Sequence, residues 1–361
     1  MLAVLATLVT SAGVFANFAE GLENNHGALL IDMIDYQASR PFVARTLLPT
    51  AVRAIAAVTR TPVERLLGRR GGEPSPEEGQ PPAGERRSGL TAMKHLLAAH
   101  PAETAAALGL MYGCLVGFAY LAARLFAIYY ESPPAVARLL PALAPLGVPL
   151  FYFPGKWSYP YDLSSLFLTT LCLLFLAQRR WLPYAIAFTL ACLNKETAVF
   201  LVPVFWVFHR LDGRLDEGQL TSRTALQLAI FAATKLALGA LFRNNPGPYM
   251  EFHLFDHNLW TTLAWLRGGY GLTGLVVTAL PVLCILDGWS EKPLLFRSGL
   301  VMLPPMLLLG FAFGWFEEWR QYLECYPILL MLILGSVTRA FGTRRRAEDA
   351  ALDSAGRVAA A

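Results

Sequence analysis

Long apolar runs dominate the chain and constrain its fold more than any single motif. Of the 361 residues, 55% are hydrophobic and only 16% are charged. About 20 apolar residues let an α-helix cross the roughly 30 Å hydrocarbon core of a bilayer, where lipid-exposed backbone must be helical or part of a closed barrel. We therefore predict an all-α, polytopic transmembrane bundle of about ten spans. The runs cover residues 1–18, 104–129, 135–153, 162–177, 182–193, 197–208, 224–242, 270–287, 294–315 and 323–340.

Two consecutive runs are too short to cross alone. At 1.5 Å per residue, 182–193 and 197–208 each reach about 18 Å. The polar stretch 194–197 lies between them. Polar backbone at membrane depth is tolerated where it lines a cavity or is buried in protein. We therefore predict a broken pair, in which Lys195 and Glu196 either pair to fix helix packing or serve a functional site.

Positive charge predicts the orientation. If each run crosses once from a cytoplasmic start, the short basic loops fall inside, as the positive-inside rule requires. The formal net charge of +4 then reflects topology and lipid contact, and no nucleic-acid partner is expected. We predict a single integral membrane domain over residues 1–341 and a cytoplasmic tail over 342–361, in the plasma (inner) membrane of a bacterium. The basic loops contain Arg138, Arg179, Arg180, 209–223, 292–297 and 344–346.

The long loop over residues 19–102 is predicted to lie outside. Within 41–60, apolar side chains fall on one arc of a helical wheel and Arg45, Arg53 and Arg60 on the other. This pattern is typical of an amphipathic helix lying in the membrane interface. Its arginines either hold lipid phosphates or anchor the helix by snorkelling. Residues 68–90, rich in Pro, Gly, Glu and Arg, predict a disordered insertion.

An ionisable cluster follows the first run. Its members are Asp32, Asp35, Gln37 and Arg40, with Tyr36 among them. Charged groups flanked by membrane spans are costly to desolvate, so they indicate a functional site. The predicted topology places further charged residues on the same outer face, and these are candidate partners: Lys156, Asp162, Glu318 and Arg320.

A metal site has one candidate. His253 and His257 are four residues apart, so they share a helix face, and Glu251 and Asp256 lie beside them. We interpret this cluster as ordinary loop polarity or as contact with an acceptor, with a divalent metal ion as a cofactor as the alternative. The five cysteines fall in or at the ends of apolar runs without ligand-like spacing, and we interpret them as small core residues.

Four short motifs together resemble those of the C-type, multi-spanning glycosyltransferase superfamily. Its members include protein O-mannosyltransferases, mycobacterial mannolipid mannosyltransferases and lipid A aminoarabinose transferases. The chain departs from the pattern in the first motif, whose second acid is three residues on rather than adjacent, and in the insertion in the first outer loop. The motifs are Asp32-Met33-Ile34-Asp35-Tyr36; Tyr161-Asp162-Leu163 ahead of Gln178-Arg179-Arg180; Leu193-Asn194-Lys195-Glu196; and Glu318-Trp319-Arg320 before Tyr326-Pro327.

The resemblance implies an inverting, single-displacement transfer of a sugar from a polyprenyl-phosphate donor at the outer membrane face. The acceptor would be a hydroxyl of a glycan, lipid or protein, and no nucleotide-binding motif is required. Such transfer needs a carboxylate base near the acceptor and cations near the departing phosphate. The expected roles are: Asp32 as base; Asp35 and Asp162 for support or sugar contacts; Arg40, Lys195 and Arg320 at the phosphate; Gln37, Tyr36, Lys156, Glu196 and Glu318 as further site residues.

Two other classes remain open. A transporter or lipid flippase is also typical of broken helices with intramembrane charges, but it should show two related halves, and the chain has no internal repeat. A non-catalytic membrane scaffold is the third interpretation. It gives no reason for acids and bases to gather on one face.

Overall fold

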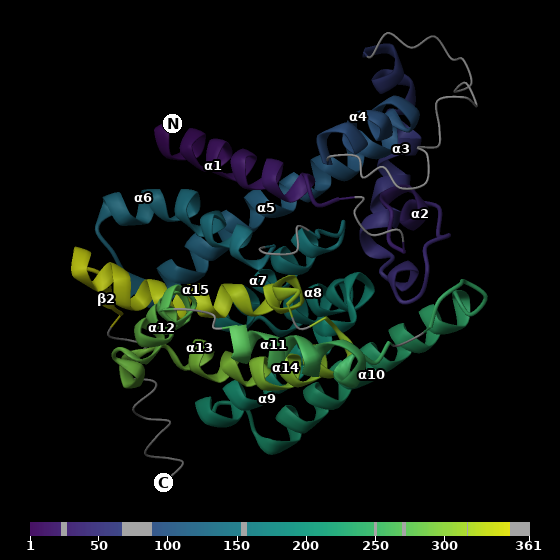
Figure 1. Ribbon diagram of the computed structural model, residues 1–361. Helices are drawn as coiled ribbons and strands as arrows, with labels where there is room; N and C mark the ends of the chain where they lie inside the picture. Colours follow the sequence, from purple (N-terminus) through teal and green to yellow (C-terminus); the bar gives the residue numbers. More distant parts are fainter. Residues whose placement is uncertain are drawn as a thin grey trace.

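The computed structural model is helical almost throughout the part of the chain that it describes (Figure 1), which confirms the all-α fold class. It describes residues 1–22, 27–66, 89–152, 157–248, 251–268, 272–315 and 317–346. Two short strands, β1 (Tyr130–Glu131) and β2 (Arg344–Arg345), pair antiparallel. Within these residues, six helical stretches are long and apolar enough to span a bilayer, so the protein is an integral membrane protein. The six are Leu2–Ala19, Pro101–Tyr129, Pro134–Phe151, Glu217–Leu241, Leu294–Phe313 and Trp319–Phe341.

The helices follow the apolar runs closely. The first half of the chain forms α1 (Leu2–Ala19), α2 (Leu30–Ile34), η1 (Phe42–Ala44), α3 (Leu47–Leu66), α4 (Gly89–Ala99), α5 (Pro101–Tyr129), α6 (Pro134–Leu143), η3 (Ala144–Phe151) and α7 (Asp162–Ala177). The middle forms α8 (Trp181–Asn194), η4 (Glu196–Phe200), α9 (Leu201–Asp212), α10 (Glu217–Leu241), the π-helical turn η5 (Leu254–Asn258) and α11 (Leu259–Gly268). The last part forms α12 (Leu272–Leu286), η6 (Trp289–Glu291), α13 (Leu294–Gly299), η7 (Leu300–Met302), α14 (Leu303–Phe313), η8 (Trp319–Cys325), α15 (Tyr326–Val337) and η9 (Thr338–Phe341).

Helix α5 packs against α1, α3, α6 and α7. Its fully buried side chains include Met111, Leu115 and Phe118, which recur every three or four residues and so share one face. At Gly117 the ring of Phe167 on α7 comes so close that a Cβ atom would lie 2.7 Å from its Cε2 atom. The missing side chain therefore lets α5 and α7 pack tightly.

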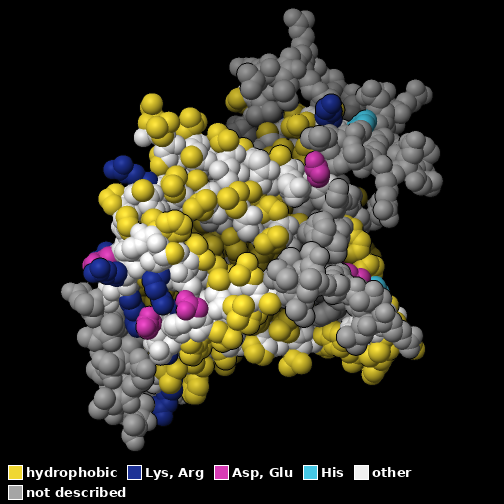
Figure 2. All heavy atoms as spheres, turned by 60° about the vertical axis from the view of Figure 1, so that its left-hand side comes forward, with side chains coloured by type: hydrophobic (Ala, Val, Ile, Leu, Met, Phe, Trp, Pro, Cys, Tyr) yellow, Lys and Arg dark blue, Asp and Glu magenta, His cyan; other side chains and the backbone are white. Residues whose placement is uncertain are grey.

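Large apolar side chains also cover the outside of the molecule. Leu182, Ile186, Leu236 and Leu308 are each more than half exposed. Figure 2 shows hydrophobic side chains spread over one face, with few charged side chains among them. An apolar exterior of this extent is expected of a surface that contacts lipid rather than water.

Loops that the sequence assigns to the inner side of the membrane meet one another in the structure. Strands β1 and β2 pair at one end of the bundle, which we call the strand end, and Arg339 contacts Glu291 at 3.2 Å. Arg179, from another loop assigned to that side, forms an ion pair with Asp212. The loops assigned to the outer side also meet. Ser158 N donates to the Gly21 carbonyl, Arg40 Nη1 to the Arg243 carbonyl and Asn258 Nδ2 to the Gly314 carbonyl.

Three boundaries differ from the sequence-based prediction. The helix predicted over 41–60 is the short turn η1 followed by α3, so Arg45 precedes the helix and is buried instead of lying on its polar face. The outer loop predicted between the runs 224–242 and 270–287 contains η5 and α11. Residues 344–345, in the predicted tail, pair with β1. Of the predicted insertion, only residues 89 and 90 lie within the described part, where they begin α4.

Candidate functional site

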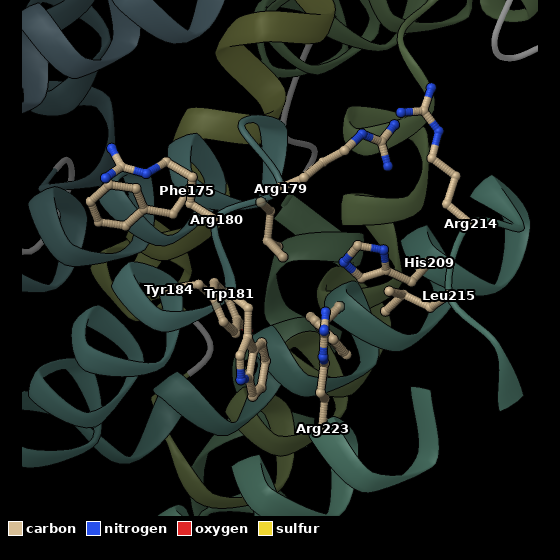
Figure 3. Close-up of a pocket in the computed structure, with 11 residues that line it drawn as sticks. Phe175, Arg179, Arg180, Trp181, Tyr184, His209, Arg214, Leu215 and Arg223 are labelled. Carbon is tan, nitrogen blue, oxygen red and sulfur yellow. The ribbon is translucent and has the colours of Figure 1, made fainter. Parts of the chain in front are cut away.

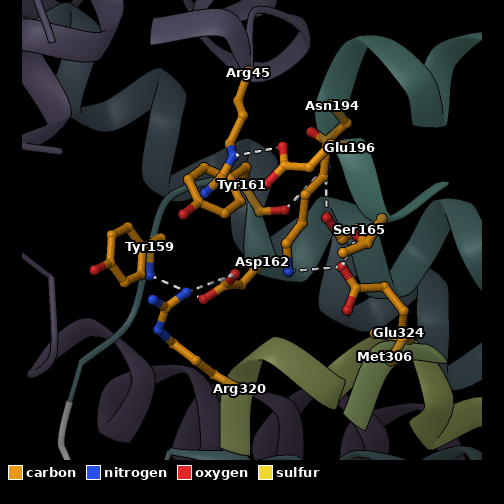
Figure 4. Close-up of polar contacts among 12 residues, drawn as sticks. Arg45, Tyr159, Tyr161, Asp162, Ser165, Asn194, Glu196, Met306, Arg320 and Glu324 are labelled. Atoms are coloured by element: carbon orange, nitrogen blue, oxygen red, sulfur yellow. Dashed lines mark hydrogen bonds and ion pairs between the residues drawn. The ribbon is translucent and has the colours of Figure 1, made fainter. Parts of the chain in front are cut away.

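Seven charged side chains form a network at the end of the bundle where α7 begins and α8 ends. Figure 4 shows most of them converging around Tyr159 and Tyr161. They come from four segments that are far apart in the sequence, so only the tertiary fold brings them together. We call this set the buried charge network: Arg45, Asp162, Lys195, Glu196, Glu318, Arg320 and Glu324.

Asp162 lies at the centre of the network and is fully buried. It is the first residue of α7, and its Oδ2 accepts a hydrogen bond from the backbone N–H of Tyr159 at 3.1 Å. A carboxylate is stabilised at a helix N-terminus by the unpaired backbone N–H groups and the helix dipole. Within the part of the chain that the structure describes, its Oδ1 has no hydrogen-bond partner.

Arg320, the second residue of η8, faces Asp162. Its Nη1 lies 3.9 Å from Asp162 Oδ1, and its Nη2 donates to Glu318 Oε2 at 2.5 Å. The guanidinium carbon lies 3.6 Å from the centre of the Tyr159 ring, an arrangement typical of a cation–π contact. The Nε atom of Arg320 is buried, and none of the described residues forms a hydrogen bond with it. Arg320 therefore has hydrogen-bonding capacity that its protein neighbours do not use.

Lys195 pairs with Glu324, and Nζ lies 2.7 Å from Oε1. Both side chains are buried, with 6% and 3% of their surface exposed. The helical path ends at Asn194, and Lys195 adopts an extended backbone (φ −158°, ψ 147°) before η4 begins. This break turns the ammonium group inward. Thr197 Oγ1 also donates to Glu324 Oε1 at 2.8 Å.

Arg45 and Glu196 form a two-pronged ion pair, with Nε at 3.2 Å from Oε2 and Nη2 against Oε1. The guanidinium carbon of Arg45 lies 4.2 Å from the centre of the Tyr161 ring. A planar guanidinium matches a carboxylate in this geometry and stacks on an aromatic face, as a lysine cannot. The Glu196 side chain is 45% exposed, so the network opens at this edge.

Asn194 ties the end of α8 to the start of α7. Its Nδ2 donates to the Tyr161 carbonyl at 3.0 Å and to Ser165 Oγ at 2.8 Å. Its Oδ1 accepts a hydrogen bond from Ser164 Oγ at 2.7 Å. These contacts hold the backbone of Asp162 and Lys195 in register.

The acidic cluster of the first loop forms a second group. Asp32, on α2, is partly buried, whereas Asp35 and Gln37 are exposed. The Asp32 carbonyl accepts hydrogen bonds from Gln37 N at 2.7 Å and Ala38 N at 3.0 Å, which close the turn. Burial, and secondly the Asp35 carboxylate, raise the pKa of Asp32 above its ordinary value. Within the described part of the chain, neither carboxylate forms an ion pair.

Tyr36 and Arg40 position the same loop. Tyr36 has a positive φ of 61°, and its hydroxyl shares a 2.7 Å hydrogen bond with Thr50 on α3. Arg40 N donates to the Pro246 carbonyl at 2.8 Å, so this loop is held against the segment that follows α10. Met33 and Ala38 pack in one apolar cluster with Tyr159 and Tyr161. That cluster connects the first loop to the buried charge network.

The structure thus divides the predicted site residues into two groups. Asp162, Lys195, Glu196, Glu318 and Arg320 belong to the buried charge network. Asp32, Asp35, Tyr36, Gln37 and Arg40 lie in the first-loop group, and Lys156 lies outside the described residues.

The predicted metal-like histidines contact different carboxylates. His253 lies 3.1 Å from Glu251 and 3.2 Å from Asp256, whereas His257 lies 2.6 Å from Glu317. Among the residues that the structure describes, no group of three or more His, Cys, Asp or Glu side chains is arranged to hold a metal ion. A divalent cofactor therefore stays a prediction.

Sequence reasoning did not place Arg45, Glu324 or Tyr159 in this network. Arg45 fitted the polar side of an amphipathic helix, and nothing local indicated its pairing with a residue 151 positions later. Glu324 did carry a signal, since it is an acid inside the last apolar run and must find a partner there. Tyr159 could be recognised only from the position of Arg320 above its ring.

Comparison of the chain with protein-family models, with curated proteins and with solved structures finds no match.

Proposed function

We propose that this integral membrane protein transfers a sugar from a polyprenyl-phosphate donor to an acceptor hydroxyl. The reaction takes place at the end of the bundle that holds the first-loop group and the buried charge network. The ten predicted crossings, with α8 and η4–α9 as the broken pair, place that end at the outer face of the membrane of a bacterial cell. The acceptor is a glycan, lipid or protein.

One observation carries the proposal. Three of the four motifs that resemble the C-type glycosyltransferases supply Asp162, Lys195 and Arg320, and these converge in one buried network. Among the residues that the structure describes, Asp162 Oδ1 and Arg320 Nε have no hydrogen-bond partner, so the network keeps unused hydrogen-bonding capacity at both atoms. Buried polar groups are nearly always paired, so unpaired ones at the centre of a charged cluster favour a ligand site over a purely structural one.

The depth of the network supports a lipid-linked donor. Helix α8 has 14 residues, so Lys195 lies about 21 Å from the start of that helix, short of the roughly 30 Å apolar core. Charged groups at that depth can reach a phosphate carried by a lipid at the membrane boundary. A water-soluble nucleotide sugar has no need of so deep a site.

The proposed roles follow from the surroundings. Asp32 is the general base, because its raised pKa brings it closer to the operating pH and its side chain is partly accessible. Lys195 and Arg320 contact the departing phosphate, joined by Arg40 from the first loop. The carboxylates of Asp162, Glu196 and Glu318 hold the cations in place, while Asp35, Tyr36, Gln37 and Lys156 contact the sugar or the acceptor. A divalent metal ion would supplement the cations at the phosphate.

The test is a transfer assay on purified protein in liposomes that contain polyprenyl-phosphate sugars with a labelled sugar. Asp32→Asn keeps the size of the side chain but cannot take a proton, so we expect a loss of about 10²–10⁴-fold with donor affinity retained. Asp287→Asn is the matched control, because this exposed carboxylate lies beyond α12, near Arg339 at the strand end. Arg320→Gln should weaken donor binding as well as turnover, because the phosphate charge exists in the ground state.

Three carboxylate variants decide the outcome. If Asp35→Asn or Asp162→Asn abolishes transfer while Asp32→Asn keeps it, the base is misassigned but the reaction class survives. If Asp32→Asn, Asp35→Asn and Asp162→Asn all transfer sugar at the rate of the Asp287→Asn control, the transferase proposal fails. Repeating the transfer assay with an added chelator tests whether the reaction requires a divalent metal ion.

A transporter or flippase is the second candidate, and the break at Lys195 favours it. Interrupted helices with charged residues at the break also line transport sites. The same liposomes distinguish the two, because a flippase moves a fluorescent polyprenyl-phosphate sugar between leaflets without any acceptor. A transferase forms product only when the acceptor is present.

A further inference from the structure

A second charged site lies at the other end of α8, away from the buried charge network. A cavity of about 70 Å³ opens between the end of α7, the start of α8, the end of α9 and the start of α10. Trp181, Tyr184 and Phe205 form its aromatic wall. Five basic residues line it: Arg179, Arg180, His209, Arg214 and Arg223.

Arginine side chains outnumber acidic side chains around this cavity. Arg179 pairs with Asp212, with Nη2 at 2.8 Å from Oδ1, and Arg214 Nε lies 3.8 Å from the same carboxylate. Within the described part of the chain, Arg180 and Arg223 form no ion pair. They lie over aromatic rings instead, 5.8 Å from the centre of Phe175 and 5.2 Å from that of Trp181. Among the described residues, Asp212 therefore pairs with two of the four arginines that line the cavity.

His209 supplies a second, independent observation. Its side chain lines the cavity, only 6% of its surface is exposed, and its Nδ1 atom is buried without a hydrogen-bond partner among the described residues. The ring is held in place by Phe205 and Phe208, whose ring centres lie 4.6 Å and 5.0 Å away. An unpaired buried nitrogen is costly, so a fixed imidazole of this kind indicates a ligand that supplies the missing hydrogen bond.

Figure 3 shows how these groups are arranged. The guanidinium of Arg223 and the imidazole of His209 point into the same space beside Trp181, whereas Arg180 and Arg214 extend to either side. The N-terminus of the 14-residue helix α8 opens beside them at Trp181. Backbone N–H groups and the helix dipole at such an end favour an anion.

We propose that this cavity binds a phosphate group, contributed either by the head group of an anionic phospholipid or by free phosphate. Arg223 donates in the forked geometry that matches phosphate oxygens, and His209 Nδ1 donates the remaining hydrogen bond. A water needs roughly 10–15 Å³ of such space, so the cavity holds a group of a few heavy atoms, the size of a phosphate and much smaller than a nucleotide. The site does not depend on the proposed sugar transfer.

The experiment measures binding through Trp181, because the Arg223 guanidinium lies over its ring. The Trp181 signal is the fluorescence of the protein minus that of the Trp181→Phe variant. One arm titrates detergent-purified protein with sodium phosphate against sodium chloride at matched ionic strength. The other compares nanodiscs of phosphatidylcholine with nanodiscs that also contain phosphatidylglycerol.

Two arginine variants make the test specific. Arg223→Gln should weaken the response by about tenfold or more, since it removes a charge-assisted hydrogen bond. Arg210→Gln is the matched control. Arg210 lies near the end of α9, which borders the cavity, but it pairs with Glu217 and does not line the cavity. It removes the same charge and should leave the response unchanged. Arg223→Lys keeps the charge without the fork and should give an intermediate loss, which decides the question if Arg223→Gln does not fold.

The two arms identify the source of the phosphate. A response to phosphatidylglycerol alone assigns the site to a lipid head group, and a response to sodium phosphate in detergent assigns it to the free ion. Equal losses in the Arg210 and Arg223 variants would show that only general electrostatics is involved and would overturn the proposal. So would the absence of a Trp181 response to both probes.

Discussion

Removing one partner of the Lys195–Glu324 pair should destabilise the protein strongly. In Glu324→Gln the Lys195 ammonium, only 6% exposed, loses the carboxylate that lies 2.7 Å away. An uncompensated buried charge typically costs about 3–5 kcal/mol. Thr197 keeps a hydrogen-bond acceptor in the new amide, so the loss reports the charge itself.

The magnitude can be bounded by a double variant. Lys195→Met with Glu324→Gln removes both charges and replaces the lysine by an apolar side chain of similar length. Replacing a whole buried pair in this way is often close to neutral. We therefore expect the double variant to recover most of the stability that Glu324→Gln loses, which gives a coupling energy of about 2–4 kcal/mol in a double-mutant cycle.

Unfolding in mixed micelles of sodium dodecyl sulfate and a mild detergent gives the free-energy differences. The exposed Arg210–Glu217 pair provides the control, because its side chains are 56% and 72% exposed. Such a pair contributes at most about 1 kcal/mol, so Glu217→Gln should leave the midpoint nearly unchanged. If Glu324→Gln were no more destabilising than Glu217→Gln, Lys195 would not be buried as an ion pair and the network would be wrong.

Three further predictions follow from the first loop, the helix junction and the topology. Because burial and Asp35 raise the pKa of Asp32, the transfer rate should fall as pH drops through a value above the ordinary aspartate range, and Asp35→Asn should move that fall to lower pH in a rate–pH profile. Asn194→Ala removes three hydrogen bonds between α7 and α8 and should cost about 1–3 kcal/mol in the same unfolding measurement, with Ser164→Ala costing less. Cysteines at the exposed positions Asn244 and Ser290 should react oppositely with an impermeant reagent in intact cells, and equal labelling would refute the proposed orientation.

The local character of the chain is largely predictable from its sequence. Apolar runs determine the helices, because a helix satisfies its own backbone hydrogen bonds inside a membrane without help from other segments. The run predicted over 104–129 corresponds to α5, and the run over 162–177 matches α7. The polar stretch at Lys195 likewise predicts a break, since the sequence leaves too few apolar residues on either side to cross.

The pairing of charges could not be predicted in the same way. Lys195 and Glu196 are neighbours in the sequence, and a direct pair between them was one of the expectations. In the structure they pair with Glu324 and Arg45 instead, because the extended backbone at the break sends consecutive side chains to opposite sides. Which partner each one meets depends on how η8 and the segment before α3 pack against the break.

The sequence by itself therefore determined a helical membrane protein, the positions of its helices and the residues whose charge must be compensated. The tertiary structure alone decided that Asp162, Lys195 and Arg320 belong to one network and that Asp32 lies in another group. It also decided that Arg45 is buried and does not lie on the polar face of an interfacial helix. Hydrophobicity and backbone hydrogen bonding act within a segment and can be recognised there. Ion pairs between segments depend on distances that exist only after the helices have packed.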